Sequence, residues 1–124
     1  MERIERSKMM EDYYKGFEGY PEIDFYTYID DMKLGIAMWE GYFDNIMKEI
    51  NPSNGRWTSL AYYYHLDEGW YDESPWEIPS NTEALELLET IHISNLDTIT
   101  QEILLKLINL LKKNINRQVY IEYS

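Results

Sequence analysis

The sequence predicts one α+β domain, predominantly helical, with a small antiparallel sheet that includes the C-terminal strand. Three segments carry apolar residues at helical spacing, and two shorter segments are rich in residues that favour strands. The chain has 124 residues, the size of one ordinary domain, so we expect residues 1–124 to fold as a single unit. It contains no cysteine, which excludes disulfides, thiolate chemistry and cysteine-based zinc sites.

The first 20 residues give a weak helical pattern. Their charged start has no apolar core of the kind found in signal peptides. No apolar run in the chain approaches the roughly 18 residues of a membrane span, so we expect a cytoplasmic protein without membrane contact. The apolar positions of the expected short helix are Ile4, Met10, Tyr14 and Phe17.

The clearest helical pattern runs over residues 24–50, where apolar side chains recur at steps of four and three. Asp24 is a suitable N-cap, and the turn-forming residues 51–55 end the element. Gly35 and Gly41 each lower helix stability by about 1 kcal/mol relative to alanine, so a break at either position stays open. The apolar stripe consists of Phe25, Ile29, Met32, Ile36, Trp39, Phe43, Ile46 and Ile50.

Two segments favour strands. Residues 60–66 are rich in tyrosine and predict a strand with Tyr62 and Tyr64 on one face. Residues 118–123 alternate between apolar and polar side chains and predict the closing strand, with residues 60–66 as its partner. The acidic and aromatic residues 67–79 contain two prolines, which predict an irregular loop.

Two further helices are predicted in the second half. Ser80 and Glu83 form a capping box that begins a helix ending at His92. A later helix runs to about Asn114, and its start stays open between a cap formed by Ser94 with Asp97 and one formed by Thr98 with Gln101. The core positions of the two helices are Ala84, Leu87, Leu88, Ile91, Ile103, Leu104, Leu107, Ile108 and Leu111, with Glu83, Glu86 and Glu89 outside.

The net charge of −12 is distributed unevenly. Residues 57–105 contain ten acidic side chains and no lysine or arginine, whereas residues 106–124 contain four bases and one acid. Such a field attracts a basic partner and repels the phosphates of nucleic acids. The alternative is that acidity serves solubility alone, although solubility does not require the exclusion of every base.

The segment 57–78, WTSLAYYYHLDEGWYDESPWEI, combines aromatic and acidic side chains. Tryptophan and tyrosine dominate the energetics of protein interfaces. We expect Trp57 and Tyr62 to pack against the sheet, and Trp70 and Trp76 to be at least half exposed. The predicted partner-binding residues are Asp67, Glu68, Trp70, Tyr71, Asp72, Glu73, Trp76 and Glu77.

The sequence predicts no catalytic residue, no cofactor and no metal site. His65 and His92, together with the carboxylates of residues 67–73, match no zinc or calcium spacing. There is no nucleophile elbow, no glycine-rich phosphate loop and no cysteine–histidine pair. A small metal-dependent hydrolase that uses the carboxylates of residues 65–77 is kept as the enzymatic alternative.

The chain resembles the immunity proteins of bacterial polymorphic-toxin systems, of the contact-dependent growth inhibition kind and the ribonuclease-toxin type. The resemblance is carried by GWYDESPWEIP at residues 69–79, the acidic leucine-rich helix that follows, and VYIEY at residues 119–123. It implies a small cytoplasmic, non-enzymatic protein that binds a cognate toxin domain and blocks its active site. The runner-up is an acidic interaction domain outside toxin systems, either a nucleic-acid mimic or an adaptor.

The resemblance also implies how inhibition would work. Many such toxins are nucleases, whose clefts must be basic to hold phosphates. As a hypothesis, two tryptophans supply the buried anchors, Trp70 and Trp76. The carboxylates that would take the places of substrate phosphates are Asp67, Glu68, Asp72, Glu73 and Glu77.

Overall fold

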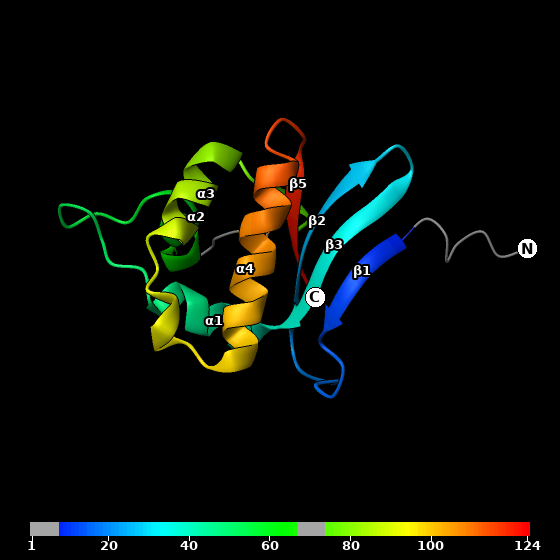
Figure 1. The fold of residues 1–124 in the computed structure, drawn as a ribbon, viewed down its shortest axis with the longest axis horizontal. Helices are drawn as coiled ribbons and strands as arrows, with labels where there is room; N and C mark the ends of the chain where they lie inside the picture. The colour runs from blue at the N-terminus through cyan, green and yellow to red at the C-terminus, as the bar shows by residue number, and fades with distance from the viewer. Residues whose placement is uncertain (1–7, 67–73) are drawn as a thin grey trace, which may run out of the picture.

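The protein is described by a computed structural model over residues 8–66 and 74–124 (Figure 1). Of these residues 40% are helical and 28% lie in strands, so the α+β class is confirmed and the predicted predominance of helix is wrong. The strands are β1 (Lys8–Tyr13), β2 (Glu22–Ile29), β3 (Met32–Trp39), β4 (Trp76–Glu77) and β5 (Val119–Tyr123). The helices are α1 (Glu40–Lys48), α2 (Ser59–His65), α3 (Asn81–Glu89) and α4 (Thr98–Lys113), with a 3₁₀ turn at Ile93–Asn95.

The described strands form a mixed sheet in the order β1-β3-β2-β5-β4. β1 runs parallel to β3, and the other neighbours are antiparallel, so the predicted antiparallel sheet is larger and mixed. The closing strand is confirmed, but its main partner is β2 and not residues 60–66. Helices α1 and α4 pack on one face of the sheet, α3 packs on α4, and α2 packs on α3 (Figure 1).

The predicted helix over residues 24–50 is wrong in its first half, where β2 and β3 form a hairpin. Asp30, whose φ is 55°, and Asp31 make the two-residue turn between the paired residues Ile29 and Met32. A step of four residues keeps a side chain on one face of a helix and also on one face of a strand, because it equals two strand periods. Phe25 and Ile36 therefore do enter the core, but from paired strands.

Two consequences of the hairpin concern single residues. Asp24 is not an N-cap, since it lies in the middle of β2 opposite Ala37. Gly35 lies opposite Tyr26, and a Cβ at position 35 would come 2.0 Å from the carbonyl oxygen of Phe25. Close backbone approach, rather than a helix break, therefore explains this glycine.

The predicted strand over residues 60–66 is wrong, because this segment forms α2. Leu60 and Ala61 are buried in the core, and the hydroxyl of Tyr64 donates to Asp44 of α1 at 2.7 Å. Tertiary packing has overridden the strand preference of the three tyrosines. Tyr62 points away from the core and is 47% exposed, so the expectation that it packs on the sheet is also wrong.

The N-terminal segment differs from the prediction as well. Its described part forms β1 in place of a short amphipathic helix. Phe17, which follows this strand, stacks on Trp39 with ring centroids 4.5 Å apart. Because Trp39 ends β3, this contact holds the connection between β1 and β2 against the sheet.

The C-terminal half follows the prediction closely. The Ser80 side chain accepts a hydrogen bond from the amide of Glu83 at 3.2 Å and so caps α3. The cap of α4 is Asp97, between the two predicted alternatives. Lys112 and Lys113 lie in the last turn of α4, where the helix dipole favours cations. In the described part of the chain no helix is both long and apolar enough to cross a membrane.

Replacing Gly35 by alanine tests the close approach of β2 and β3. We expect Gly35→Ala to lower the free energy of unfolding by about 2 kcal/mol or more, because the new Cβ meets backbone and not a flexible side chain. Gly16→Ala is the matched control, since nothing lies within 4 Å of its Cβ and only its φ of +97° costs about 1 kcal/mol. If urea denaturation showed the same loss of unfolding free energy for both variants, the close approach of β2 and β3 at Gly35 would be contradicted.

Candidate partner-binding surface

The structure describes two of the eight predicted binding residues, Trp76 and Glu77. The other six, Asp67, Glu68, Trp70, Tyr71, Asp72 and Glu73, lie outside the described residues. Trp76 and Glu77 form β4, so their side chains point to opposite faces of the sheet. Trp76 is largely buried against the core, with its ring 4.7 Å from that of Tyr63, and the expectation that it is half exposed is wrong.

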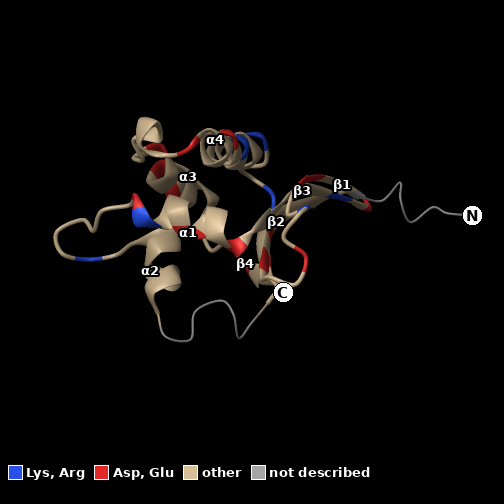
Figure 2. Cartoon of the chain, turned by 90° about the horizontal axis from the view of Figure 1, so that it is seen from below, with Lys and Arg blue, Asp and Glu red and all other residues tan. Residues whose placement is uncertain are grey.

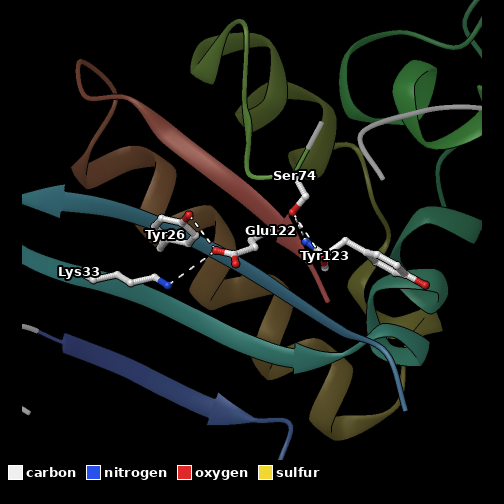
Figure 3. A network of polar contacts seen from close by, with 5 residues as sticks. All are labelled: Tyr26, Lys33, Ser74, Glu122 and Tyr123. Atoms are coloured by element: carbon white, nitrogen blue, oxygen red, sulfur yellow. Dashed lines mark hydrogen bonds and ion pairs between the residues drawn. The ribbon is translucent and has the colours of Figure 1, made fainter. Parts of the chain in front are cut away.

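Ser74 anchors this segment to the edge of the sheet. Its hydroxyl oxygen accepts a hydrogen bond from the amide of Tyr123 at 2.9 Å and donates to the carbonyl oxygen of the same residue at 3.4 Å (Figure 3). These two hydrogen bonds fix the position of residues 74–79 beside β5. Nothing local in the sequence indicates a backbone partner so distant in the chain.

The open face of the sheet, opposite α1 and α4, carries a tyrosine cluster with internally paired charges. Tyr26 donates to the Glu122 carboxylate at 3.0 Å, and Lys33 lies 3.9 Å from the same oxygen (Figure 3). The Lys33 ammonium also lies 4.1 Å from the centroid of the Tyr26 ring. Tyr28 and Tyr120 border Tyr26 on this face. The Glu122 carboxylate at the centre of this face is therefore already paired with the Lys33 ammonium.

Asp24 on the same face has a carboxyl whose pKa is raised to about 8. Burial is the largest cause, followed by a hydrogen bond with Glu22 and the charge of that residue; Glu122 also raises the pKa, and Lys33 lowers it. One oxygen of Asp24 is buried and has no hydrogen-bond partner among the described residues. The centre of the open face consequently has little net charge, despite its acidic composition.

A groove on another side of the molecule has uncompensated acid. It consists of two adjoining hollows of about 600 and 280 Å³ between the segment 51–59, α2 and α3. Thr58, Ser59 and Glu83 line both hollows, so the two lie side by side. The larger hollow has an acidic end with Glu49, Glu83 and Glu86, and the smaller one has an aromatic end with Tyr62, Tyr63, Trp76 and Pro79.

The two groove carboxylates on α3 are not paired with a cation among the described residues. No lysine or arginine lines either hollow, and across the described ranges Glu83 and Glu86 make no ion pair. Glu89, one turn further along α3, differs because Lys112 lies 3.3 Å from it. Figure 2 shows acidic residues on α3 and basic residues toward one end of α4. Charge is therefore left unpaired at the groove and paired elsewhere on the same helix.

The wall of the groove formed by residues 51–59 is built from a tight turn. Ser53 and Arg56 exchange backbone hydrogen bonds of 2.8 and 3.0 Å around Asn54 and Gly55, whose φ values of 53° and 76° match a two-residue hairpin turn. Ser59 also has a positive φ of 51°, an uncommon backbone state for serine that concentrates at binding sites. Sequence analysis read these residues only as the end of a helix.

Comparison with protein-family models, curated proteins and solved structures gives no match to this chain. Within residues 8–66 and 74–124, no three histidine, aspartate or glutamate side chains come together in a way that could hold a metal ion. The groove and the open face of the sheet are the two candidate surfaces for binding a partner.

The pKa of Asp24 predicts how stability depends on pH. A carboxyl whose pKa rises from 3.8 to about 8 on folding stabilises the fold most below pH 3.8, and this stability is lost as the pH rises through 8. We expect the free energy of unfolding to fall between about pH 5 and pH 8 in the wild type and to fall less in Asp24→Asn.

Urea denaturation across this pH range provides the test. The two proteins differ at position 24 alone, so the difference between the two slopes isolates Asp24. Parallel slopes for wild type and Asp24→Asn would show that Asp24 is ionised in the folded protein near pH 7.

Proposed function

We propose that the chain is a non-enzymatic immunity protein that binds a basic toxin domain, a nuclease, and neutralises it by occluding its active site. The observation that carries the proposal is the groove beside α3, in which Glu83 and Glu86 have no cation partner among the described residues. A helix with like charges three residues apart is destabilised by about 0.2–0.5 kcal/mol. Glu83 lies in the first turn of α3, where the helix dipole favours a carboxylate, so this cost falls on Glu86.

A nuclease is the class of partner that this charge pattern fits best. Its cleft must be basic in order to hold phosphates, so an acidic groove presents the complementary field. Electrostatic complementarity accelerates association and rejects partners of the same charge. The acidic and aromatic segment 67–77, predicted to bind the partner, has the same charge sign and includes Trp76 at the aromatic end of the groove.

The open face of the sheet is the weaker candidate for the toxin contact. Glu122 is paired with Lys33 and Tyr26, and Asp24 is protonated near neutral pH. A basic partner would have to displace these internal contacts before it gained its own. The groove requires no such displacement, and we assign the principal contact to it.

The proposal is tested by recovery of the tagged chain with its partners from its own cells at low and high salt. We expect one basic protein whose recovery falls as salt rises, because the attraction is screened. The purified partner should lose nuclease activity when this chain is added. A basic partner whose activity is untouched by a saturating amount of the chain would contradict the proposal.

Charge reversal locates the contact. Glu86→Lys should weaken partner binding about tenfold at low salt, mainly through a slower association rate. Asp31→Lys, at the turn between β2 and β3, changes the net charge by the same amount and should alter affinity less than about twofold. Equal effects of the two substitutions, measured by surface plasmon resonance, would show that only the total charge matters.

A further inference from the structure

The groove beside α3 has a chemical asymmetry that specifies the group it receives. At one end Tyr62, Tyr63 and Trp76 form a continuous aromatic cluster, with successive ring centroids 5.0 and 4.7 Å apart. Tyr62 is 47% exposed, so its ring is accessible to a ligand, whereas Trp76 is largely covered. Glu83, which lines both hollows, lies where the aromatic end meets the acidic end.

A guanidinium group satisfies both ends at once. It is planar and delocalised, stacks on aromatic rings, and presents paired N–H donors that match a carboxylate. An ammonium group pairs with carboxylates as a point charge but does not stack in the same way. The juxtaposition of an accessible tyrosine ring with unpaired glutamates therefore favours arginine over lysine.

The hollow between β1 and α4 differs in its lining and provides a comparison within the same molecule. It has a volume of about 410 Å³ and is lined by apolar residues such as Met9 and Leu34, with Lys106 and Lys113 at the side formed by α4. Glu11 also lines this hollow, but its carboxylate is already paired with Lys106 at 2.7 Å, so no free carboxylate faces a cationic ligand there and Lys113 repels one. This second hollow serves as an internal negative control.

We propose that the groove between residues 51–59, α2 and α3 is a receptor for an arginine side chain of the toxin. The guanidinium stacks on Tyr62 and pairs with Glu83, and Glu86 adds a second carboxylate along the groove. The assignment of this arginine to the toxin rests on the proposed function; the arginine-binding property of the groove does not. The walls are set by the tight turn at Asn54 and Gly55 and by the Ser80 cap of α3, so little ordering is needed on binding.

The test uses L-argininamide and L-lysinamide as probes of the full chain, followed by ¹H–¹⁵N NMR titration. We expect saturable shifts at the amides of residues 58–63 and 80–87 and at the Trp76 indole, with none around Met9 and Lys113. Argininamide should bind about threefold more tightly than lysinamide, the difference that an exposed cation–π contact provides.

Substitutions separate the two ends of the groove. Glu83→Gln with Glu86→Gln should weaken argininamide binding about fivefold, as expected for loss of two exposed charge pairs. Glu89→Gln on the same helix, already paired with Lys112 outside the groove, should leave binding unchanged. Tyr62→Leu should remove the preference for argininamide over lysinamide while both probes still bind, because the charges remain.

The outcomes distinguish this inference from the proposed function. Shifts confined to the groove that depend on Glu83, Glu86 and Tyr62 support it, whether or not a toxin is found. Equal binding of the two probes, shifts spread over every acidic surface, or no shifts at all overturn it. Loss of toxin binding in Glu86→Lys would then stand as evidence for a contact that does not use an arginine.

Discussion

The pairing of β2 with β5 is the constraint on which the rest of the structure depends. It joins residues 92 to 100 positions apart, from Thr27 opposite Val119 to Ile23 opposite Tyr123. The Thr27 hydroxyl adds a hydrogen bond of 2.7 Å to the Gln118 carbonyl. β5 in turn holds β4 and, through Tyr123, the hydroxyl of Ser74. The aromatic end of the groove is thus positioned by a contact between the two halves of the chain, which also explains why Trp76 is covered and not exposed.

The distribution of charge follows from this architecture. Where carboxylates lie on the sheet, the neighbouring strands bring Lys33 and Tyr26 to Glu122, and burial leaves Asp24 protonated. Where they lie on α3, the residues that line the facing side of the larger hollow are Asn51, Pro52, Ser53, Thr58, Ser59 and a further acid, Glu49, with no lysine or arginine among them. The same excess of acid is therefore compensated on one surface and left available on another. Net charge alone does not distinguish these surfaces, but local geometry does.

Local sequence was sufficient for the elements whose boundaries are set by their own residues. The Ser80 cap, the long apolar stripe of α4 and the alternation in β5 all correspond to structure. It was insufficient for residues 24–39, because a step of four fits both a helix face and a strand face. Local sequence was also insufficient for α2. Its tyrosines favour a strand, but the packing of Leu60 and Ala61 in the core and the hydrogen bond of Tyr64 stabilise a helix. Of the two predicted binding residues that the structure describes, only Trp76 lines the groove. The groove glutamates and the wall formed by residues 51–59 were not predicted, since that wall meets α3 only in the folded chain.

The rigidity of the groove connects its structure to the proposed role. An inhibitor must hold its contacts tightly enough to compete with a polyanionic substrate, and flexible surfaces lose affinity to the ordering of side chains and loops. In this protein one wall is a closed two-residue turn and the other is a capped helix that packs on α4. The uncompensated carboxylates are thus carried on elements that are already ordered. An exposed acidic patch on a mobile surface would attract a basic protein equally well at long range, but it would not discriminate a planar guanidinium from an ammonium at contact. Discrimination requires that the ring of Tyr62 and the carboxylate of Glu83 be presented together, and the two side chains line the same hollow from two different helices.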